Sequence, residues 1–167
     1  MTISEFDHFP TEQKRESLFK CCGSHQWVNK MMTVFPVEDL VELLEGAEEK
    51  WYECTEVDWL EAYKQHPRIG DNTSVNEKLI TTAQWARDEQ SKVKNTSKEL
   101  IQKLIIANKD YEDKFGYIFI VCATGKSAEE MLKILKSRLN NSKEEETKIA
   151  AAEQLSITKL RIEKLFS

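Results

Sequence analysis

The apolar residues of this chain recur mainly at intervals of three and four, the spacing of helices that bury one face. The two clearest stripes are Leu100, Leu104, Tyr111 and Phe115, and then Met131, Leu132, Leu135 and Leu139. Each follows a Ser or Thr with Glu three residues later, namely Thr96 with Glu99 and Ser127 with Glu130. In that pattern two side chains satisfy free backbone N–H groups at a helix start, so both segments are predicted to be helices.

Similar stripes predict helices along most of the remaining chain. They are expected over residues 11–22, 24–34, 37–51, 58–65, from Ser74 with its Glu77, and over 144–166. The residues expected to face inward are Leu40, Val41, Leu44, Ala47, Trp59, Leu60, Tyr63, Ala152, Leu155 and Leu160, with Lys148, Lys159 and Lys164 outward. The acidic run SKEEETK at 142–148 is predicted to be a solvated first turn, since acids are favoured at that end of a helix.

No repeat, low-complexity tract or Pro-rich linker divides the sequence. The expected fold class is therefore all-α: one compact domain over residues 1–167, a bundle of about seven to nine helices, with one short extended segment near 117–123.

That extended segment, YIFIVCA, is aromatic and β-branched, lacks a helical period and lies between Gly116 and Gly125. In isolation it predicts a strand, but the sequence offers no second strand for it to pair with. Buried backbone amides are costly when they are left unpaired. Neighbouring helix ends or water would be the ordinary partners for these amides, and a bound ligand is the alternative.

Composition limits the classes of partner. The chain has 167 residues, 40% apolar and 32% charged, with a net charge of -5 and a pI near 5.4. Broad attraction to nucleic acid or an anionic membrane is not expected, because both need concentrated Lys and Arg. No apolar run approaches the roughly 20 residues of a membrane-spanning helix, and MTISEFDHFP lacks signal-peptide regions. An intracellular protein with free cysteines is predicted, since no CxxC pair occurs.

Three places could carry chemistry. His66, in YKQHPRIGDN, follows a predicted helix, and Pro67 after it disfavours further helix. Either the imidazole is held at the helix end for a function, or the segment is an ordinary helix stop in which His66 has no role. Glu89 and Gln90 place a carboxylate beside an amide. The pair could bind a substrate that carries hydrogen-bond donors and acceptors, or it could be part of a solvated helical face. Arg161 is either a surface cation or an anion clamp.

The common cofactor motifs do not occur. There is no GxGxxG, GxxxxGK[ST] or GxSxG, and His8, His25 and His66 are not set with acids or cysteines at metal-ligand spacing. We therefore expect no cofactor and no metal site.

Four motifs together resemble one family: HPRIG at 66–70, WARDEQ at 85–90, NKDYEDKFGYIFIVCA at 108–123 and ITKLRIEKL at 157–165. They occur in the order found in the 2-oxo-4-hydroxy-4-carboxy-5-ureidoimidazoline (OHCU) decarboxylases of urate degradation. Each motif is weak alone, but the series spans nearly the whole chain. The resemblance implies an all-α homodimer that converts the small molecule OHCU to (S)-allantoin and CO₂ without a cofactor. Animal members often end in a peroxisomal address, whereas this chain ends in KLFS, so a cytoplasmic location is expected.

The resemblance also assigns residues. His66 matches the catalytic histidine, and the adjacent Pro67 lines the site. Glu89 and Gln90 match the acid and amide that hold the substrate. In the reaction, we expect Glu89 to orient the imidazole or to bind the 4-hydroxyl and ureido donors of the substrate. The backbone of Phe119, Ile120, Val121, Cys122 and Ala123 matches a segment that contacts the ring, and Arg161 matches an arginine near the pocket.

The sequence departs from the family at Ala86, where many members have a serine that binds substrate. One lost hydroxyl should weaken binding by about 0.5 to 1.5 kcal/mol without abolishing the reaction. Two other functions stay open: a helical protein-interaction module without turnover, and a hydrolase of a related ureide that uses His66 and Glu89 to activate water.

Overall fold

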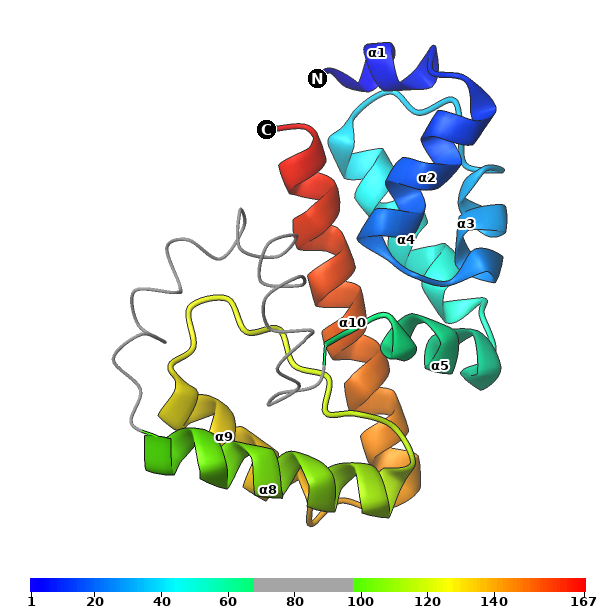
Figure 1. Cartoon of the computed structure of the whole chain (residues 1–167). Helices are drawn as coiled ribbons and strands as arrows, with labels where there is room; N and C mark the ends of the chain where they lie inside the picture. The colour runs from blue at the N-terminus through cyan, green and yellow to red at the C-terminus, as the bar shows by residue number, and fades with distance from the viewer. Residues whose placement is uncertain (68–97) are drawn as a thin grey trace. The chain divides into compact units, whose positions relative to one another are not determined.

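The computed structural model describes residues 1–67 and 98–167, and in these two ranges the chain forms eight helices and no strand (Figure 1). The all-α prediction is confirmed. The helices are α1 (Ile3–Asp7), α2 (Thr11–Cys21), α3 (His25–Met31), α4 (Leu40–Tyr52), α5 (Glu56–Lys64), α8 (Lys98–Phe115), α9 (Ala128–Arg138) and α10 (Lys143–Leu165).

Most predicted helices are present with shifted ends. Helix α3 ends at Met31 rather than at residue 34, and α1 was not predicted, because five residues are too few to show a period. Thr2 nonetheless forms a capping box with Glu5 at the start of α1. Ser127 caps α9 as predicted, with its side chain accepting from the Glu130 N–H. The predicted helix from Ser74 and the Thr96 cap lie outside the described residues.

The contacts of the chain divide it into two compact units. The first comprises Met1–Gln65 and Ala151–Ser167, the second comprises His66–Ala150, and the division falls inside α10. The single-domain assignment stays a prediction, and each unit is described by itself.

The first unit is built around two buried indoles. The Nε1 of Trp27 donates to the Ala47 carbonyl at 3.1 Å, and the Nε1 of Trp51 donates to the Ala151 carbonyl at 2.9 Å. Helix α4 therefore buries Leu43, Ala47 and Trp51, which repeat every four residues. The prediction that Val41 faces inward is wrong: its side chain is 62% exposed, because it lies about 200° around the helix from Leu43.

The part of α10 in the first unit buries polar as well as apolar residues. Leu155 is buried as predicted, but Ala152 is exposed, and Gln154 and Thr158 are buried. The Gln154 Nε2 donates to the Thr158 hydroxyl at 3.2 Å. An inward face that mixes amide and hydroxyl groups has no clean apolar stripe, which is why periodicity placed Ala152 on the wrong side.

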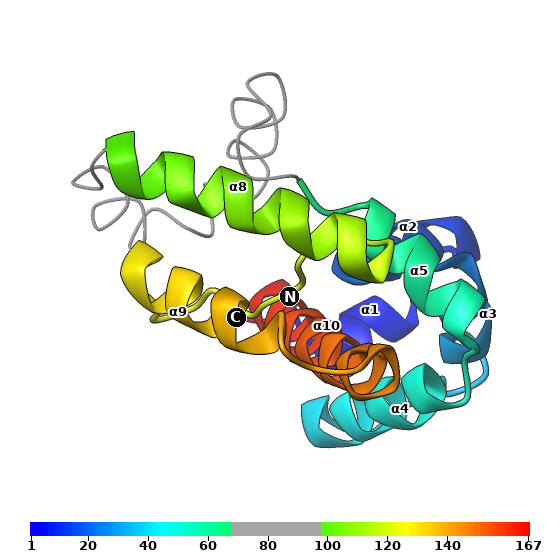
Figure 2. The ribbon, with the colours of Figure 1, turned by 90° about the horizontal axis from the view of Figure 1, so that it is seen from below.

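In the second unit, α8 and α9 lie alongside each other (Figure 2). Their core is the set of buried residues Leu104, Ala107, Tyr111, Phe115, Phe119, Ala128, Leu132 and Leu135, with Leu100 and Leu139 partly buried against it. The two stripes that predicted these helices are confirmed. Within the described ranges, no helix is long and apolar enough to cross a membrane.

Candidate functional site

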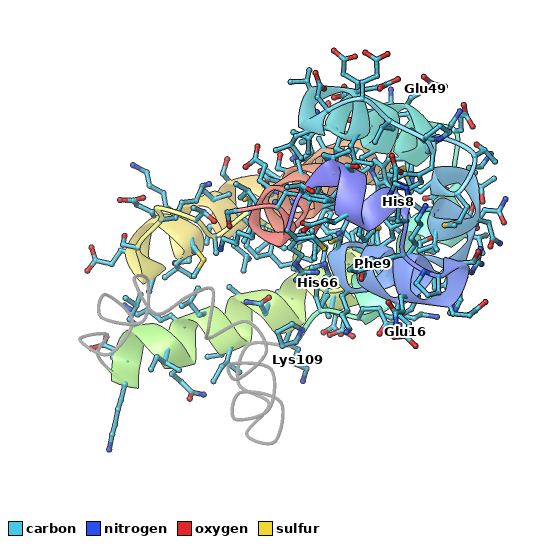
Figure 3. The ribbon with its side chains drawn as sticks, turned by 90° about the horizontal axis from the view of Figure 1, so that it is seen from above. His8, Phe9, Glu16, Glu49, His66 and Lys109 are labelled. Carbon is cyan, nitrogen blue, oxygen red and sulfur yellow. The ribbon has the colours of Figure 1, made fainter. Side chains whose placement is uncertain are left out.

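His66 lies just beyond the end of α5. The helix stops at Lys64, Gln65 is its C-cap, and His66 follows in a bend with its side chain partly exposed (Figure 3). Pro67 comes next and is exposed. The expected break before the proline is thus present, and it leaves the imidazole outside the helix.

The segment at residues 117–123, which connects α8 to α9, forms neither helix nor strand (Figure 1). The predicted non-helical segment is confirmed, and it forms no strand, because the second unit supplies no strand among its described residues to pair with it. Gly116 has φ 84° and Gly125 has φ 73°, so a glycine in the left-handed region stands on each side of the segment. Phe119 and Ile120 are buried.

Two cations hold carbonyl groups of this segment. The Nη1 of Arg138 donates to the Ile120 carbonyl at 2.6 Å, and the Nζ of Lys126 donates to the Cys122 carbonyl at 2.7 Å. The Lys126 backbone N–H also donates to the Ala123 carbonyl at 3.0 Å. Cationic side chains therefore bond to the Ile120 and Cys122 carbonyls, and a backbone N–H bonds to the Ala123 carbonyl, so these acceptors do not need a second strand.

Arg138 is itself part of a buried polar network. Its Nε donates to Glu146 Oε1 at 2.7 Å, and its guanidinium carbon lies 4.6 Å from the centre of the Phe119 ring. Glu146 also accepts from the Tyr111 hydroxyl and, at 3.0 Å, from the Asn141 amide. Arg138 is 6% exposed and Glu146 is 0% exposed, so the prediction of a wholly solvated acidic run is wrong at Glu146.

Tyr111 enters this network as a neutral donor. Burial and the hydrogen bond to Glu146 both raise the pKa of its phenol. The proton consequently stays on Tyr111 and points at the carboxylate, which leaves Arg138 as the charge partner of Glu146.

Sequence reasoning missed Arg138, Lys126 and Glu146 as residues that support the segment. One signal was available for Arg138, which lies three residues after the buried Leu135 and so near the apolar stripe of its helix. A charged residue there is usually paired when it is buried.

Arg161 lies on α10 in the first unit and is partly buried. Its Nη1 donates to the Cys21 carbonyl at 3.3 Å and to the Lys20 carbonyl at 3.4 Å, both at the end of α2. Burial lowers the pKa of its guanidinium. Across residues 1–67 and 98–167, no carboxylate forms an ion pair with Arg161, so its charge is balanced only by carbonyl dipoles there.

The structure thus places His66 and the 119–123 backbone in the second unit and Arg161 in the first. Ala86, Glu89 and Gln90 lie outside the described residues. The part of the chain that is described contains no cluster of three or more His, Cys, Asp or Glu residues able to hold a metal ion.

Comparison with known proteins gives a consistent relationship. The chain is 38% identical over 148 residues to the uric acid degradation bifunctional protein TTL of Arabidopsis thaliana, covering 88% of this chain and 45% of that protein. It is 27% identical over 129 residues to the uric acid degradation bifunctional protein of Bacillus sp. (strain TB-90), covering 76% of this chain and 23% of the other. The chain spans less than half the length of these relatives.

Solved structures agree in fold. A crystal structure of an OHCU decarboxylase in the presence of (S)-allantoin matches with a TM-score of 0.74 and 38% identity, covering 90% of this chain and 97% of that one. A crystal structure of an (S)-allantoin synthase matches with a TM-score of 0.74 at 14% identity, over 98% of this chain and 54% of that one, and so agrees in fold alone.

A model of one protein family matches residues 7–163, with the description OHCU decarboxylase. That match covers nearly all of the sequence, including the motifs at 66–70, 85–90 and 108–123 and the motif at 157–165 as far as residue 163. The chain belongs to the OHCU decarboxylase family.

Proposed function

We propose that this protein decarboxylates OHCU to (S)-allantoin without a cofactor, placing one proton on a single face of the product. The observation that carries the proposal is the 38% identity to a solved OHCU decarboxylase, over 97% of that chain. Membership of the family and the position of His66 outside the end of α5 support it further.

The reaction needs a place for an electron pair and a source of one proton. When the bond between the ring carbon and the carboxylate breaks, CO₂ leaves and the pair moves into the conjugated C=N system of the substrate ring. A proton then adds to the ring carbon that bears the ureido group, which becomes the stereocentre of (S)-allantoin. The hydroxyl on the neighbouring carbon becomes the ring carbonyl, and its proton passes to the ring nitrogen that took up the electron pair. The substrate is thus its own electron sink, and the protein has to position groups and deliver the proton.

His66 is the proton donor in this proposal. An imidazole titrates near neutral pH, so it can give a proton and regain one in each turnover. Its place after the last turn of α5 leaves the ring outside the helix and partly exposed. Glu89 would orient this ring or bind the 4-hydroxyl and ureido donors of the substrate. As the family resemblance implies, Gln90 would hold the substrate and Pro67 would line the site.

Two further groups would bind the charges of the substrate. Arg161, which has no carboxylate partner in the described ranges, would attract the substrate carboxylate. Backbone N–H groups of the 119–123 segment would stabilise the negative charge that grows on the ring as CO₂ leaves. One well-placed donor of this kind contributes about 2.7 to 4 kcal/mol to the transition state.

The test couples the protein to the supply of its substrate. Urate, urate oxidase and 5-hydroxyisourate hydrolase generate OHCU, and the optical activity of the allantoin formed is followed with and without this chain. Acceleration with one-handed product is expected. His66→Asn should remove most of the acceleration, with His8→Asn as the matched control, because His8 is an exposed histidine bonded to the Ser4 carbonyl.

The same assay separates the alternatives. A helical interaction module would leave the rate and the racemic outcome of spontaneous decay unchanged. A ureide hydrolase would consume a related cyclic amide without releasing CO₂. Full rate and full handedness in His66→Asn would refute the assignment of His66.

The family resemblance also implies a homodimer, which we propose here and which sedimentation equilibrium would test. The cytoplasmic location stays a prediction, with cell fractionation as its test.

A further inference from the structure

A buried polar network among the described residues of the second unit lies against the segment that the proposed function uses. Arg138 is 6% exposed, yet one of its nitrogens is committed to a backbone carbonyl, that of Ile120, at 2.6 Å. A buried charge is costly to desolvate, so its position needs a compensating set of partners.

Those partners leave Arg138 one orientation. Its Nε side faces Glu146, which is fixed in turn by Tyr111 and Asn141. The rings of Phe119 and Tyr111 lie 4.6 Å and 5.8 Å from the guanidinium carbon. Because the guanidinium is planar and rigid, fixing the Nε side aims Nη1 at the Ile120 carbonyl.

Lys126 makes the equivalent contact two residues further along. Its Nζ donates to the Cys122 carbonyl at 2.7 Å, and its side chain is partly buried. No carboxylate in residues 1–67 or 98–167 pairs with Lys126, so its positive charge acts mainly on that peptide group.

Each of these two cations binds the C=O side of a peptide group, and the N–H of the same group lies on the opposite side. The Ile120–Val121 and Cys122–Ala123 peptide bonds are trans, so the N–H of each points away from its own C=O. The Val121 N–H is therefore directed away from Arg138, and the Ala123 N–H is directed away from Lys126. Within the described part of the chain, neither N–H has an acceptor.

A cation on the carbonyl of a peptide group draws electron density toward the oxygen and makes the N–H of the same group a stronger donor, since hydrogen bonds in a chain polarise one another. We propose that Arg138 and Lys126 are positioning residues for decarboxylation: they hold and polarise the two peptide groups whose N–H donors, on Val121 and Ala123, bind the negative charge developing on the substrate ring. This inference rests on the proposed function.

Substitution of Lys126 is the sharper test, because it removes one charge at a partly buried site. Lys126→Met should lower kcat about tenfold with less than a threefold change in KM, a smaller loss than the roughly 100- to 1,000-fold that follows removal of a whole oxyanion donor. Lys126→Arg should restore most of kcat, since it returns a cation within reach of the Cys122 carbonyl. Arg138→Lys should also lower kcat, because an ammonium cannot serve Glu146 and Ile120 in the same fixed geometry.

Lys114→Met is the matched control. Lys114 also holds backbone carbonyls of the second unit, those of Leu139 and, at 2.9 Å, Asn141, but none in the 119–123 segment. It should keep the kcat of the wild type. A direct readout is the amide proton NMR shift of Val121 and Ala123 on adding (S)-allantoin, which should be smaller in Lys126→Met than in Lys114→Met.

The outcomes separate the two proposals. No turnover by the wild-type chain would overturn the proposed function and this inference with it. Wild-type turnover, with kcat in Lys126→Met equal to that in Lys114→Met, would overturn the positioning roles alone. If Arg138→Lys does not fold, the three Lys126 and Lys114 variants still decide the question.

Discussion

The hydroxyl of Tyr111 offers a test of how much the buried network contributes to stability. Tyr111 is 0% exposed, and its hydroxyl donates to Glu146 and lies 3.4 Å from Arg138 Nη2. Tyr111→Phe removes that oxygen and keeps the ring, which packs against Phe115 with centroids 4.6 Å apart and against Phe119 at 5.3 Å.

The expected loss follows from what Glu146 retains. A hydrogen bond to a charged group contributes about 1.5 to 3 kcal/mol. In the variant, Glu146 still accepts from Arg138 Nε at 2.7 Å and from Asn141 at 3.0 Å, so its charge stays paired. We therefore expect the free energy of unfolding to fall by about 2 kcal/mol, rather than by the roughly 3 to 5 kcal/mol that loss of a buried ion-pair partner costs.

Urea denaturation followed by far-ultraviolet circular dichroism measures this directly. With a slope of about 2 kcal/mol per molar urea, the midpoint should fall by about 1 M while the slope stays unchanged. Tyr52→Phe is the control, because Tyr52 is 51% exposed and its removal should change the free energy by less than about 0.5 kcal/mol. A midpoint for Tyr111→Phe indistinguishable from that of Tyr52→Phe would show that the hydroxyl contributes nothing.

Three further predictions concern the glycines, the thiols and the substrate site. Gly116→Ala and Gly125→Ala should each lower the free energy of unfolding by about 1 to 2 kcal/mol, because φ is 84° and 73° at these positions. No neighbour lies within 4 Å of an added Cβ, so this loss comes from backbone strain and not from a clash. The corresponding Asn variants should lose less free energy, as measured by urea midpoints. Burial raises the pKa of the Cys21 thiol and of the Cys22 thiol to about 12. The free energy of unfolding should therefore fall as the pH rises above about 9, because the thiols of the unfolded chain lose protons that those of the folded chain keep. Cys22→Ala should reduce the difference between the urea midpoints measured at about pH 8 and at about pH 10. Ala86→Ser should lower KM for OHCU roughly two- to tenfold by restoring one hydrogen bond, and an unchanged or higher KM in steady-state kinetics would contradict the role given to the family serine.

Local pattern alone predicted most of the described helices, α1 excepted, and the break between α8 and α9. Apolar residues at three- and four-residue spacing predicted α8 and α9 with the faces that they bury, because a helix must hide one stripe to be stable. Gly116 and Gly125 predicted the limits of the non-helical segment, since only glycine adopts a positive φ without strain. The motif around His66 likewise predicted both the end of α5 and the family.

Tertiary contacts decided what holds that segment. Glu146 resembles its solvated acidic neighbours in sequence, yet it is buried because Tyr111, 35 residues away along the chain, donates to it together with the nearer Arg138 and Asn141. From the sequence, helix ends, water or a ligand were the expected partners for the backbone amides of this segment; that its Ile120 and Cys122 carbonyls accept from Arg138 and Lys126 emerged only from the structure. The free energy of burying a charge or an unpaired amide depends on which groups surround it, and neither composition nor periodicity along the sequence contains that information.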